Sequence, residues 1–293
     1  MTLRSISGMT LLWLAACLMT SASNAQTDLA SGDEPHFLFT DWAGPALRVW
    51  YEVPADYHAD MPIAFVMHGV GRDADRYYAE WRDYAHSYGF VLLVPEFSDA
   101  NFPRAAGYNL GNVFADDGSM NPESQWSYSA LDPVFDHMVE KLGSSRQSYR
   151  LYGHSAGAQF AHRFLLYKPA AKVEMAISAN AGWYTMPDAG VEFPYGLQGS
   201  GIEPQSLVPL LARPVVILLG DQDIDPAHPS LRVTPEAVAQ GPHRFARGQT
   251  FYRQAAELAS ALGVPFAWQL QTVAGAAHNN YQMAEAAAPL LGR

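Results

Sequence analysis

The sequence has almost no cysteine, and this scarcity excludes several kinds of site. Cys17 is the single cysteine among 293 residues, so the rest of the chain holds no disulfide, no zinc–thiolate site and no cysteine nucleophile. Basic residues are also scarce, because 18 Lys and Arg stand against 29 Asp and Glu and give a net charge of −11. Proteins that bind nucleic acid present a basic face, so this balance argues against a nucleic-acid partner.

The apolar run near the N-terminus is too short to span a membrane. It covers residues 11–19, follows the lone charge of Arg4, and is succeeded by small residues just before Gln26. This arrangement predicts a signal peptide of residues 1–25, and hence a secreted or periplasmic protein. Residues 14–17 also resemble a bacterial lipobox, and in that alternative Cys17 is lipidated and anchors the chain to a membrane.

The remaining residues, 26–293, read as a single globular domain. Hydrophobic residues make up 49% of the chain and charged residues 16%, which is typical of a protein with a sizeable core. From residue 63 onward, apolar strands alternate with segments of helical periodicity, which include residues 127–142 and 248–262. This order predicts a mostly parallel, doubly wound α/β sheet. Two polar, Gly- and Pro-rich stretches, residues 96–125 and 183–212, are expected to form a small loop-rich cap.

One motif, G-x-S-x-G around Ser155, predicts a serine nucleophile. Gly153-His154-Ser155-Ala156-Gly157 fits the pattern G-x-S-x-G between a predicted strand and a predicted helix. This layout is the nucleophile elbow, a sharp turn that exposes a serine hydroxyl. A Cβ atom at either glycine would crowd the turn, so the residue types agree with the geometry. We expect His154 to fill space in the elbow.

A serine hydroxyl needs a base, and the base needs an acid that orients it. In open α/β sheets these groups gather at the carboxyl ends of the strands. Asp223 follows the predicted strand 214–219 and is the preferred acid, with Asp221 and Asp225 as alternatives and a turn role open for all three. A calcium loop is disfavoured, because Pro226 and Arg232 occupy positions that need Gly and Glu.

The base and the oxyanion donors follow from the same reasoning. His278 comes after the predicted strand 265–273 and completes the order Ser, Asp, His. Backbone N–H groups stabilise the oxyanion at low cost, and Ala156 is expected to supply one of them. The other is assigned to Val70, with Gly71 as the alternative, in the loop after the first buried strand.

Four further residues are candidates for substrate binding. His68 and Gly69 precede Val70, where Gly69 lets the backbone approach the substrate and His68 is expected to hold the loop. Trp183 and Tyr184 follow a strand end, and either line an acyl pocket or pack beneath the long loops.

The motifs together resemble the α/β-hydrolase superfamily, and within it secreted esterases of the polyhydroxybutyrate-depolymerase and feruloyl-esterase type. The resemblance spans residues 63–291, although the chain lacks the Cys-containing oxyanion loop and the disulfides of many such esterases. It implies hydrolysis of a small or polymeric carboxylic ester through an acyl-serine, without cofactor or metal. The same triad also serves peptidases, lipases and thioesterases, and a non-catalytic hydrolase-like binding protein is a further alternative.

Overall fold

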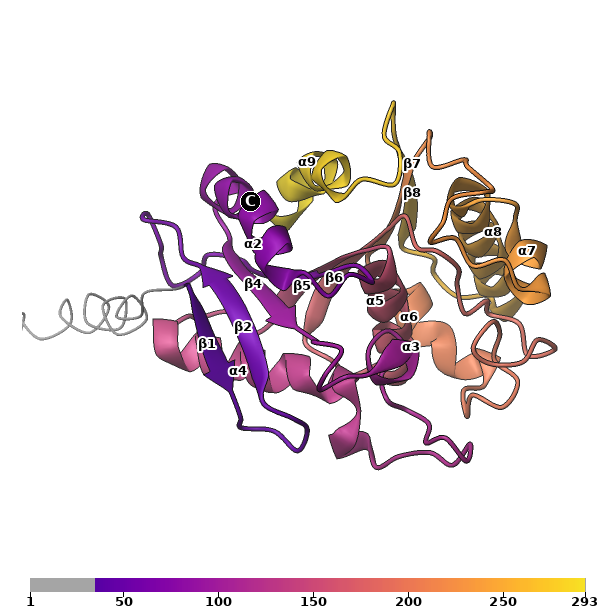
Figure 1. Ribbon diagram of the computed structural model, residues 1–293, viewed down its shortest axis with the longest axis horizontal. Helices are drawn as coiled ribbons and strands as arrows, with labels where there is room; N and C mark the ends of the chain where they lie inside the picture. Colours follow the sequence, from indigo (N-terminus) through magenta and orange to yellow (C-terminus); the bar gives the residue numbers. More distant parts are fainter. Residues whose placement is uncertain (1–34, 293) are drawn as a thin grey trace, which may run out of the picture.

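The computed structural model describes residues 35–292. The predicted signal peptide and Cys17 lie outside the described residues. The centre of the fold is an eight-stranded sheet with the strand order β1-β2-β4-β3-β5-β6-β7-β8 (Figure 1). The strands are β1 (His36–Phe39), β2 (Leu47–Glu52), β3 (Ile63–Met67), β4 (Val91–Glu96), β5 (Tyr149–His154), β6 (Val173–Ala179), β7 (Val215–Gly220) and β8 (Trp268–Val273).

The sheet is parallel from β3 to β8, as the alternation of strands and helices predicted. β1 and β2 form an antiparallel pair at one edge, and β2 pairs antiparallel with β4. The remaining neighbours are all parallel. Parallel strands have their carboxyl ends at a common edge, so the loops that follow β3, β5, β7 and β8 converge there.

Helices cover both faces of the sheet. α2 (Ala74–Tyr88) and α9 (Asn280–Leu291) lie together on one face, while α4 (Leu131–Leu142), α5 (Ala156–Tyr167) and α8 (Arg244–Leu262) cover the other (Figure 1). Side chains alternate along β3 accordingly: Phe65 packs in the core under α4 and α5, and Val66 packs in the core under α2 and α9. The chain is therefore doubly wound, as predicted.

Some helix bounds differ from the prediction. α8 begins at Arg244, four residues before the expected start at residue 248, because the His243 ring accepts a hydrogen bond from the Ala246 N–H at 3.2 Å and caps the extra turn. The segment expected to be helical from residue 127 begins as a 3₁₀ turn, η2 (Ser127–Ala130). Short elements within the connections were not predicted: α3 (Arg104–Gly107), η1 (Glu123–Gln125), η3 (Pro204–Leu207), α6 (Val208–Leu211) and α7 (Pro235–Gln240).

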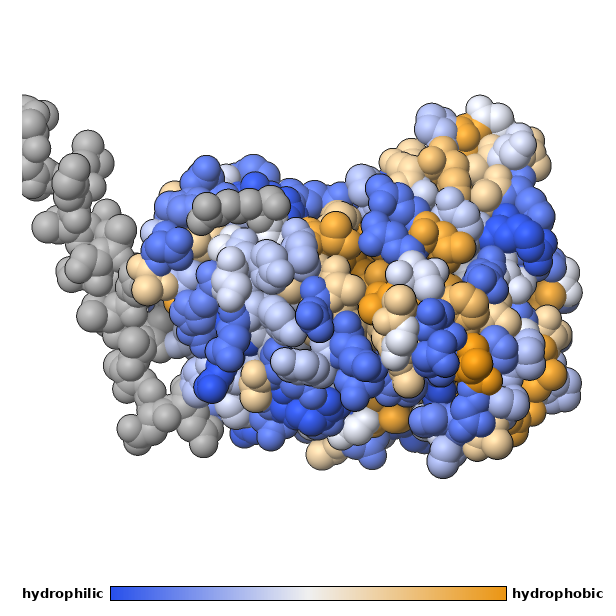
Figure 2. Space-filling model, turned by 90° about the horizontal axis from the view of Figure 1, so that it is seen from above, coloured by the Kyte–Doolittle hydropathy of each residue, from blue (hydrophilic) through white to orange (hydrophobic). Residues whose placement is uncertain are grey.

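The two irregular stretches pack against each other. The rings of Phe114 and Phe193 lie 5.3 Å apart between centroids and join one stretch to the other. On the face seen from above, apolar residues occur in small groups separated by hydrophilic ones (Figure 2). In the described part of the chain, no helix combines the length and the apolar character that a membrane crossing requires.

Candidate active site

The turn between β5 and α5 presents Ser155. Its backbone has φ 57° and ψ −114°, a conformation that non-glycine residues adopt rarely and mostly where the surroundings impose it. A Cβ atom at Gly153 would stand 2.1 Å from the Gly157 carbonyl oxygen, and one at Gly157 would stand 2.1 Å from the Met67 carbonyl oxygen. Both glycines are therefore needed for the close approach of α5 to the ends of β3 and β5.

The structure brings Ser155, His278 and Asp223 together from three different loops. His278 Nε2 lies 3.0 Å from Ser155 Oγ, and His278 Nδ1 lies 2.8 Å from Asp223 Oδ2. The Asp223 side chain is 3% exposed and that of His278 is 12% exposed. The imidazole is thus held between a buried carboxylate and a serine hydroxyl.

The electrostatics favour a neutral imidazole. A carboxylate only accepts hydrogen bonds, so Asp223 places the imidazole proton on Nδ1 and leaves the Nε2 lone pair facing Ser155. Burial lowers the pKa of His278 below its ordinary value of 6.5, and the hydrogen bond to Asp223 opposes this effect. Neutral imidazole is the form that accepts a proton from a serine hydroxyl.

The neighbouring carboxylates have other partners. Asp221 accepts a hydrogen bond from the Gly275 N–H at 2.8 Å and so ties the loop after β7 to the loop after β8. Asp225 accepts from the Ala227 N–H at 2.8 Å within its own turn. Among residues 35–292, no group of three or more His, Cys, Asp or Glu side chains is placed to hold a metal ion.

Asn180, at the end of β6, belongs to the site although the sequence reasoning missed it. Its Oδ1 accepts from the Gly220 N–H at 2.8 Å, and its Nδ2 donates to the Ala277 carbonyl oxygen at 3.1 Å. The side chain is fully buried and the backbone has φ 48°. Asn180 therefore joins the end of β7 to the residue before His278, and its only signal in the sequence is its position just after a buried strand.

Val70 and Ala156 flank Ser155 from two sides. Both line the cleft that contains the Ser155 hydroxyl. Within the described residues, neither of their N–H groups donates to a protein acceptor. Gly71, the alternative donor, lines a second cleft beside the serine.

His68 holds the loop in place, as expected. Its Nδ1–H donates to the Gly69 carbonyl oxygen at 3.0 Å, and its Nε2 accepts from the Phe97 N–H at 3.1 Å. Burial lowers the pKa of His68 to about 4, so the ring is neutral at physiological pH. The side chain is fully buried, which corrects the expectation that it contacts substrate. Gly69 does line a cleft beside Ser155.

His154 is more than a space-filling residue. Its Nδ1 lies 3.0 Å from the Tyr77 hydroxyl, and its ring centroid lies 4.8 Å from that of His278. A Cβ atom at Gly69 would stand 3.0 Å from the same Tyr77 hydroxyl. Tyr77 and His154 thus support both the elbow and the loop that carries Val70.

Comparisons with known proteins place this geometry in a family. No protein-family model and no curated protein sequence matches the chain. Among solved structures, poly(aspartic acid) hydrolase-1 from Sphingomonas sp. KT-1 is 42% identical with a TM-score of 0.86, over 88% of this chain and 99% of that one. A poly(3-hydroxybutyrate) depolymerase from Bordetella parapertussis is 34% identical with a TM-score of 0.83, over 92% of each chain. The chain belongs to the α/β-hydrolase superfamily.

Its neighbours are hydrolases, and so is this chain. An S-formylglutathione hydrolase from Agrobacterium tumefaciens is 17% identical with a TM-score of 0.55, over 87% of this chain and 92% of that one, and shares the fold.

Two clefts meet at Ser155 of the hydrolase. The first, which we call the arginine cleft, has a volume of about 360 Å³ and contains Ser155, Trp183 and three arginines. The second, the α2–α9 cleft, has a volume of about 390 Å³ and is lined by His278 and residues of the two helices. Val70 and Ser230 also line both clefts, so the Ser155 side chain lies where they join.

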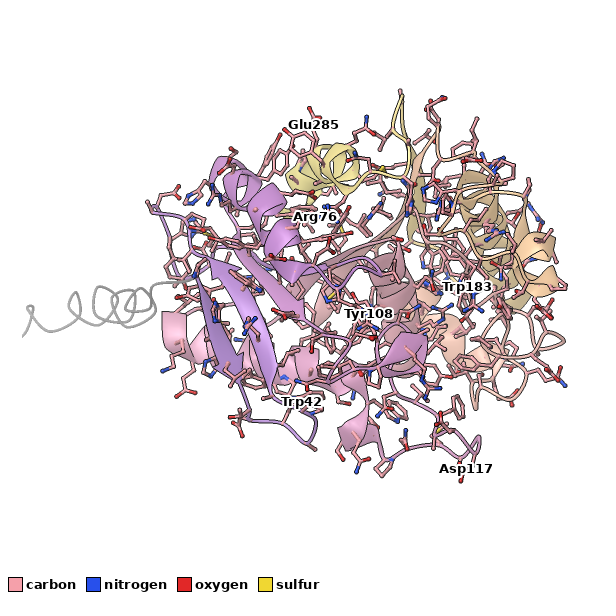
Figure 3. The ribbon with its side chains drawn as sticks, in the orientation of Figure 1. Trp42, Arg76, Tyr108, Asp117, Trp183 and Glu285 are labelled. Carbon is pink, nitrogen blue, oxygen red and sulfur yellow. The ribbon has the colours of Figure 1, made fainter. Side chains whose placement is uncertain are left out.

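The charges of the two clefts differ. Arg72, Arg104 and Arg232 line the arginine cleft, in which Asp99 is the one carboxylate among the lining residues that the structure describes. In the α2–α9 cleft, Arg76 (Figure 3) is paired with Asp73 at 2.6 Å and with Glu80 at 2.5 Å. In the arginine cleft, Arg104 pairs with Asp116 at 2.9 Å and Arg72 lies 3.7 Å from Asp99. Within the described residues Arg232 has no carboxylate partner, so the excess of positive charge in this cleft comes from Arg232.

Aromatic rings hold the guanidinium groups of the arginine cleft. The Arg72 guanidinium carbon lies 4.4 Å from the centroid of Tyr108, and that of Arg232 lies 5.2 Å from Trp183. Figure 3 shows Tyr108 beside α3 and Trp183 on the side toward α8. The buried Arg163 also contacts the Trp183 ring, at 4.0 Å. Trp183 thus lines the cleft, in agreement with the prediction that it borders a pocket.

Tyr184 points elsewhere. It is fully buried and stacks on Phe251 with a centroid distance of 4.4 Å. The expectation that Tyr184 lines the pocket is therefore corrected, because its ring packs in the core against Phe251 and His162.

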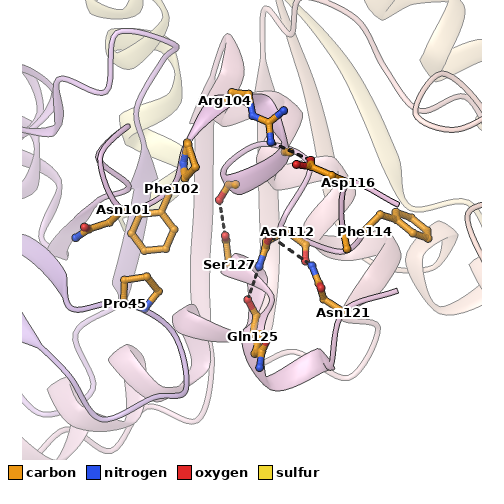
Figure 4. A pocket seen from close by; sticks show the side chains of 14 residues that line it. Pro45, Asn101, Phe102, Arg104, Asn112, Phe114, Asp116, Asn121, Gln125 and Ser127 are labelled. Carbon is orange, nitrogen blue, oxygen red and sulfur yellow. Dashed lines mark hydrogen bonds and ion pairs between the residues drawn. The ribbon is translucent and has the colours of Figure 1, made fainter. Parts of the chain in front are cut away.

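A third cavity, of about 360 Å³, lies apart from Ser155 (Figure 4). Its polar side chains bond to neighbouring parts of the same irregular stretch: Asn112 donates to the Gln125 carbonyl oxygen at 3.0 Å, and Asn121 donates to the Asn112 carbonyl oxygen at 2.9 Å. These amides fix the fold of the stretch.

Proposed function

We propose that this hydrolase cleaves carboxylic esters through an acyl-serine intermediate. The observation that carries the proposal is the continuous hydrogen-bonded chain from Asp223 through His278 to the Ser155 hydroxyl. Buried acid, neutral imidazole and strained serine form the arrangement that activates a hydroxyl for attack.

The first half of the reaction forms the acyl-enzyme. Ser155 Oγ attacks the ester carbonyl carbon while its proton passes to His278 Nε2. Asp223 stabilises the imidazolium that results. The oxyanion accepts hydrogen bonds from the N–H groups of Ala156 and Val70, and His278 then gives its proton to the departing alkoxide.

The second half releases the acid. A water molecule takes the place of the alcohol, His278 removes its proton, and the resulting hydroxide attacks the acyl carbon. Collapse of the tetrahedral intermediate breaks the bond to Ser155 Oγ, and the serine recovers its proton from His278.

Labelling with a fluorophosphonate tests the proposed nucleophile. The probe should label the wild-type protein and fail to label Ser155→Ala. Ser87→Ala is a matched control, because this exposed α2 serine donates only to the Asp83 carbonyl oxygen, and its labelling should equal that of wild type. Labelling that persists in Ser155→Ala would refute the assignment.

A second candidate is hydrolysis of an amide polymer that bears carboxylates. Two observations favour it: the positive charge of the arginine cleft, and the 42% identity to a protein described as a poly(aspartic acid) hydrolase. Each unit of such a polymer carries one carboxylate, which an arginine binds through paired hydrogen bonds. The triad would act on the amide carbonyl as it does on an ester.

Substrate comparison separates the two candidates. We would measure kcat/KM for soluble poly(aspartic acid) and for neutral 3-hydroxybutyrate oligomers. Arg232→Met should lower kcat/KM about tenfold for the anionic polymer and leave the neutral oligomers unaffected. Arg253→Met is the control, since this exposed arginine pairs with Glu257 on α8. Turnover of the oligomers alone would reject the second candidate.

Export of the chain is part of the proposal. Residues 1–25 would act as a signal peptide, or Cys17 would be lipidated. Mass spectrometry of the exported protein decides between them, because the N-terminus is Gln26 in the first case and a diacylglyceryl cysteine in the second. A cytoplasmic protein that retains Arg4 would contradict both.

A further inference from the structure

Arg244 is a fully buried cation beside the proposed catalytic acid. It is 1% exposed and stands at the first position of α8. Its Nη1 lies 3.2 Å from Asp223 Oδ1. The backbone supports the same approach, because the Phe245 N–H donates to the Asp223 carbonyl oxygen at 3.2 Å. Burying a guanidinium is costly unless it is paired, so its position beside Asp223 calls for an explanation.

The two oxygens of Asp223 have separate partners. Oδ2 faces His278 Nδ1 at 2.8 Å, and Oδ1 faces Arg244 at 3.2 Å. A carboxylate with only one partner can rotate about its Cβ–Cγ bond, whereas two partners on opposite oxygens fix that rotation. Arg244 therefore determines where the second oxygen points.

Arg244 also reaches the wall of both clefts. Its Nη2 donates to Ser230 Oγ at 2.9 Å and lies 3.4 Å from His228 Nδ1. Ser230 lines the arginine cleft and the α2–α9 cleft, next to Ser155. A single guanidinium thus bridges the acid and the loop segment against which a substrate would lie.

We infer that Arg244 is a positioning residue of this active site, which fixes the Asp223 carboxylate toward His278 and fastens the Ser230 segment over the junction of the clefts. The inference rests on the proposed function and extends it to a residue outside the triad. Arg244 acts through Asp223 and Ser230, and the reacting atoms lie beyond its reach.

The charge of Arg244 has a measurable effect on the base. A cation near the imidazole disfavours the imidazolium, so Arg244 lowers the pKa of His278, after the larger effect of burial. Further titratable groups face this pair from the elbow, the loop after β7 and α8: His154, His228, Asp225 and Arg247.

The rate of fluorophosphonate labelling as a function of pH tests the inference without a natural substrate. In Arg244→Met no cation disfavours the imidazolium, so the pKa of His278 should rise. The acid limb of the pH–rate profile, where the labelling rate falls as His278 is protonated, should then move to higher pH by about half a unit or more. The plateau rate should fall about tenfold, because the carboxylate is free to rotate. Arg244→Lys keeps the charge and should keep the limb near the wild-type position. Arg253→Met removes an exposed cation from the same helix and should leave the whole profile unchanged.

The link to the cleft wall has its own test. Ser230→Ala leaves the ion pair between Arg244 and Asp223 in place, so the acid limb of the pH–rate profile should not move. The variant loses the hydrogen bond from Arg244 to the cleft wall, so KM for a p-nitrophenyl ester should rise about threefold. An unchanged KM in this variant overturns the inference, and this result decides the matter even if Arg244→Met does not fold by circular dichroism. A folded Arg244→Met with an unshifted limb overturns it too. A wild-type protein that resists labelling would instead refute the proposed function.

Discussion

Replacing Asp223 by Asn should abolish most of the activity, and the structure explains why a nearly isosteric change is so harmful. Arg244 donates to Oδ1 of residue 223, so the oxygen of the new amide will face the guanidinium. The amide NH₂ group then faces His278 Nδ1, which has to accept a hydrogen bond. The imidazole proton moves to Nε2, where it points at Ser155 and prevents the ring from acting as a base.

The size of the effect follows from the contacts. To restore the active tautomer, the amide has to flip, which leaves a buried Arg244 N–H facing an NH₂ group and costs about 2–3 kcal/mol. The imidazolium of the transition state also loses a carboxylate, which costs about 2–3 kcal/mol more. At about 1.4 kcal/mol for each factor of ten, kcat/KM should fall about 10³- to 10⁴-fold.

Turnover of p-nitrophenyl butyrate by Asp223→Asn and Asp225→Asn checks this prediction. Asp225 is exposed and bonds only within its turn, so its variant should retain wild-type activity within about twofold. In the double variant Asp223→Asn/Arg244→Met the amide is free to turn its oxygen toward His278, and activity should recover about tenfold over the single variant. Equal activity of Asp223→Asn and Asp225→Asn would refute the assignment of the acid. A double variant no better than Asp223→Asn would show that Arg244 does not orient the amide.

The remaining predictions concern pH and packing. Because the base must be neutral and burial lowers the pKa of His278, the acid limb of kcat/KM should lie below pH 6.5, and a profile still flat at pH 4 would contradict this. Gly157→Ala should destabilise the fold by about 3 kcal/mol or more in thermal melts, because its Cβ would overlap the Met67 carbonyl, whereas Ala158→Gly should cost about 1 kcal/mol. Burial lowers the pKa of His68 in the folded protein to about 4, from the ordinary value of 6.5 that applies when the chain is unfolded. Since the unfolded state binds its proton first, the free energy of unfolding should drop by about 3 kcal/mol as the pH falls through this interval, and urea titrations of His68→Gln should show a smaller drop.

The sequence predicted the fold because the apolar strands carry a clear local pattern. Residues 63–67 and 215–220 are continuous apolar runs that the structure buries completely. Parallel strands bring their carboxyl ends together, so the residues just after each run were expected to meet. The structure places Ser155, Asp223 and His278 at such ends and in contact, while their catalytic roles remain predictions for the experiments above.

The supporting residues carry no comparable local pattern. Asn180 bonds to a backbone 40 residues away, and Arg244 pairs with a carboxylate 21 residues away. Neither contact follows from helical or strand periodicity, since both depend on how one loop lies over another. No local pattern in the sequence indicated that Arg244 lies in a helix. The N-cap of α8 is His243, a residue type uncommon at that position, and α8 begins four residues before the start that the apolar pattern indicates.

The net charge of the chain does not describe the charge inside the cleft beside Ser155. The chain carries −11 overall, yet three arginines and one carboxylate line the cleft beside Ser155. Physiological salt screens charges beyond about 8 Å, so a substrate group inside the cleft responds to the nearby guanidinium groups far more than to the distant acidic surface. The acidic composition that argues against a nucleic-acid partner therefore places no restriction on a small or polymeric carboxylate substrate. In the proposed hydrolysis of a carboxylate polymer, selection would depend on a few side chains, and two of them, Arg72 and Arg232, lie against the Tyr108 and Trp183 rings.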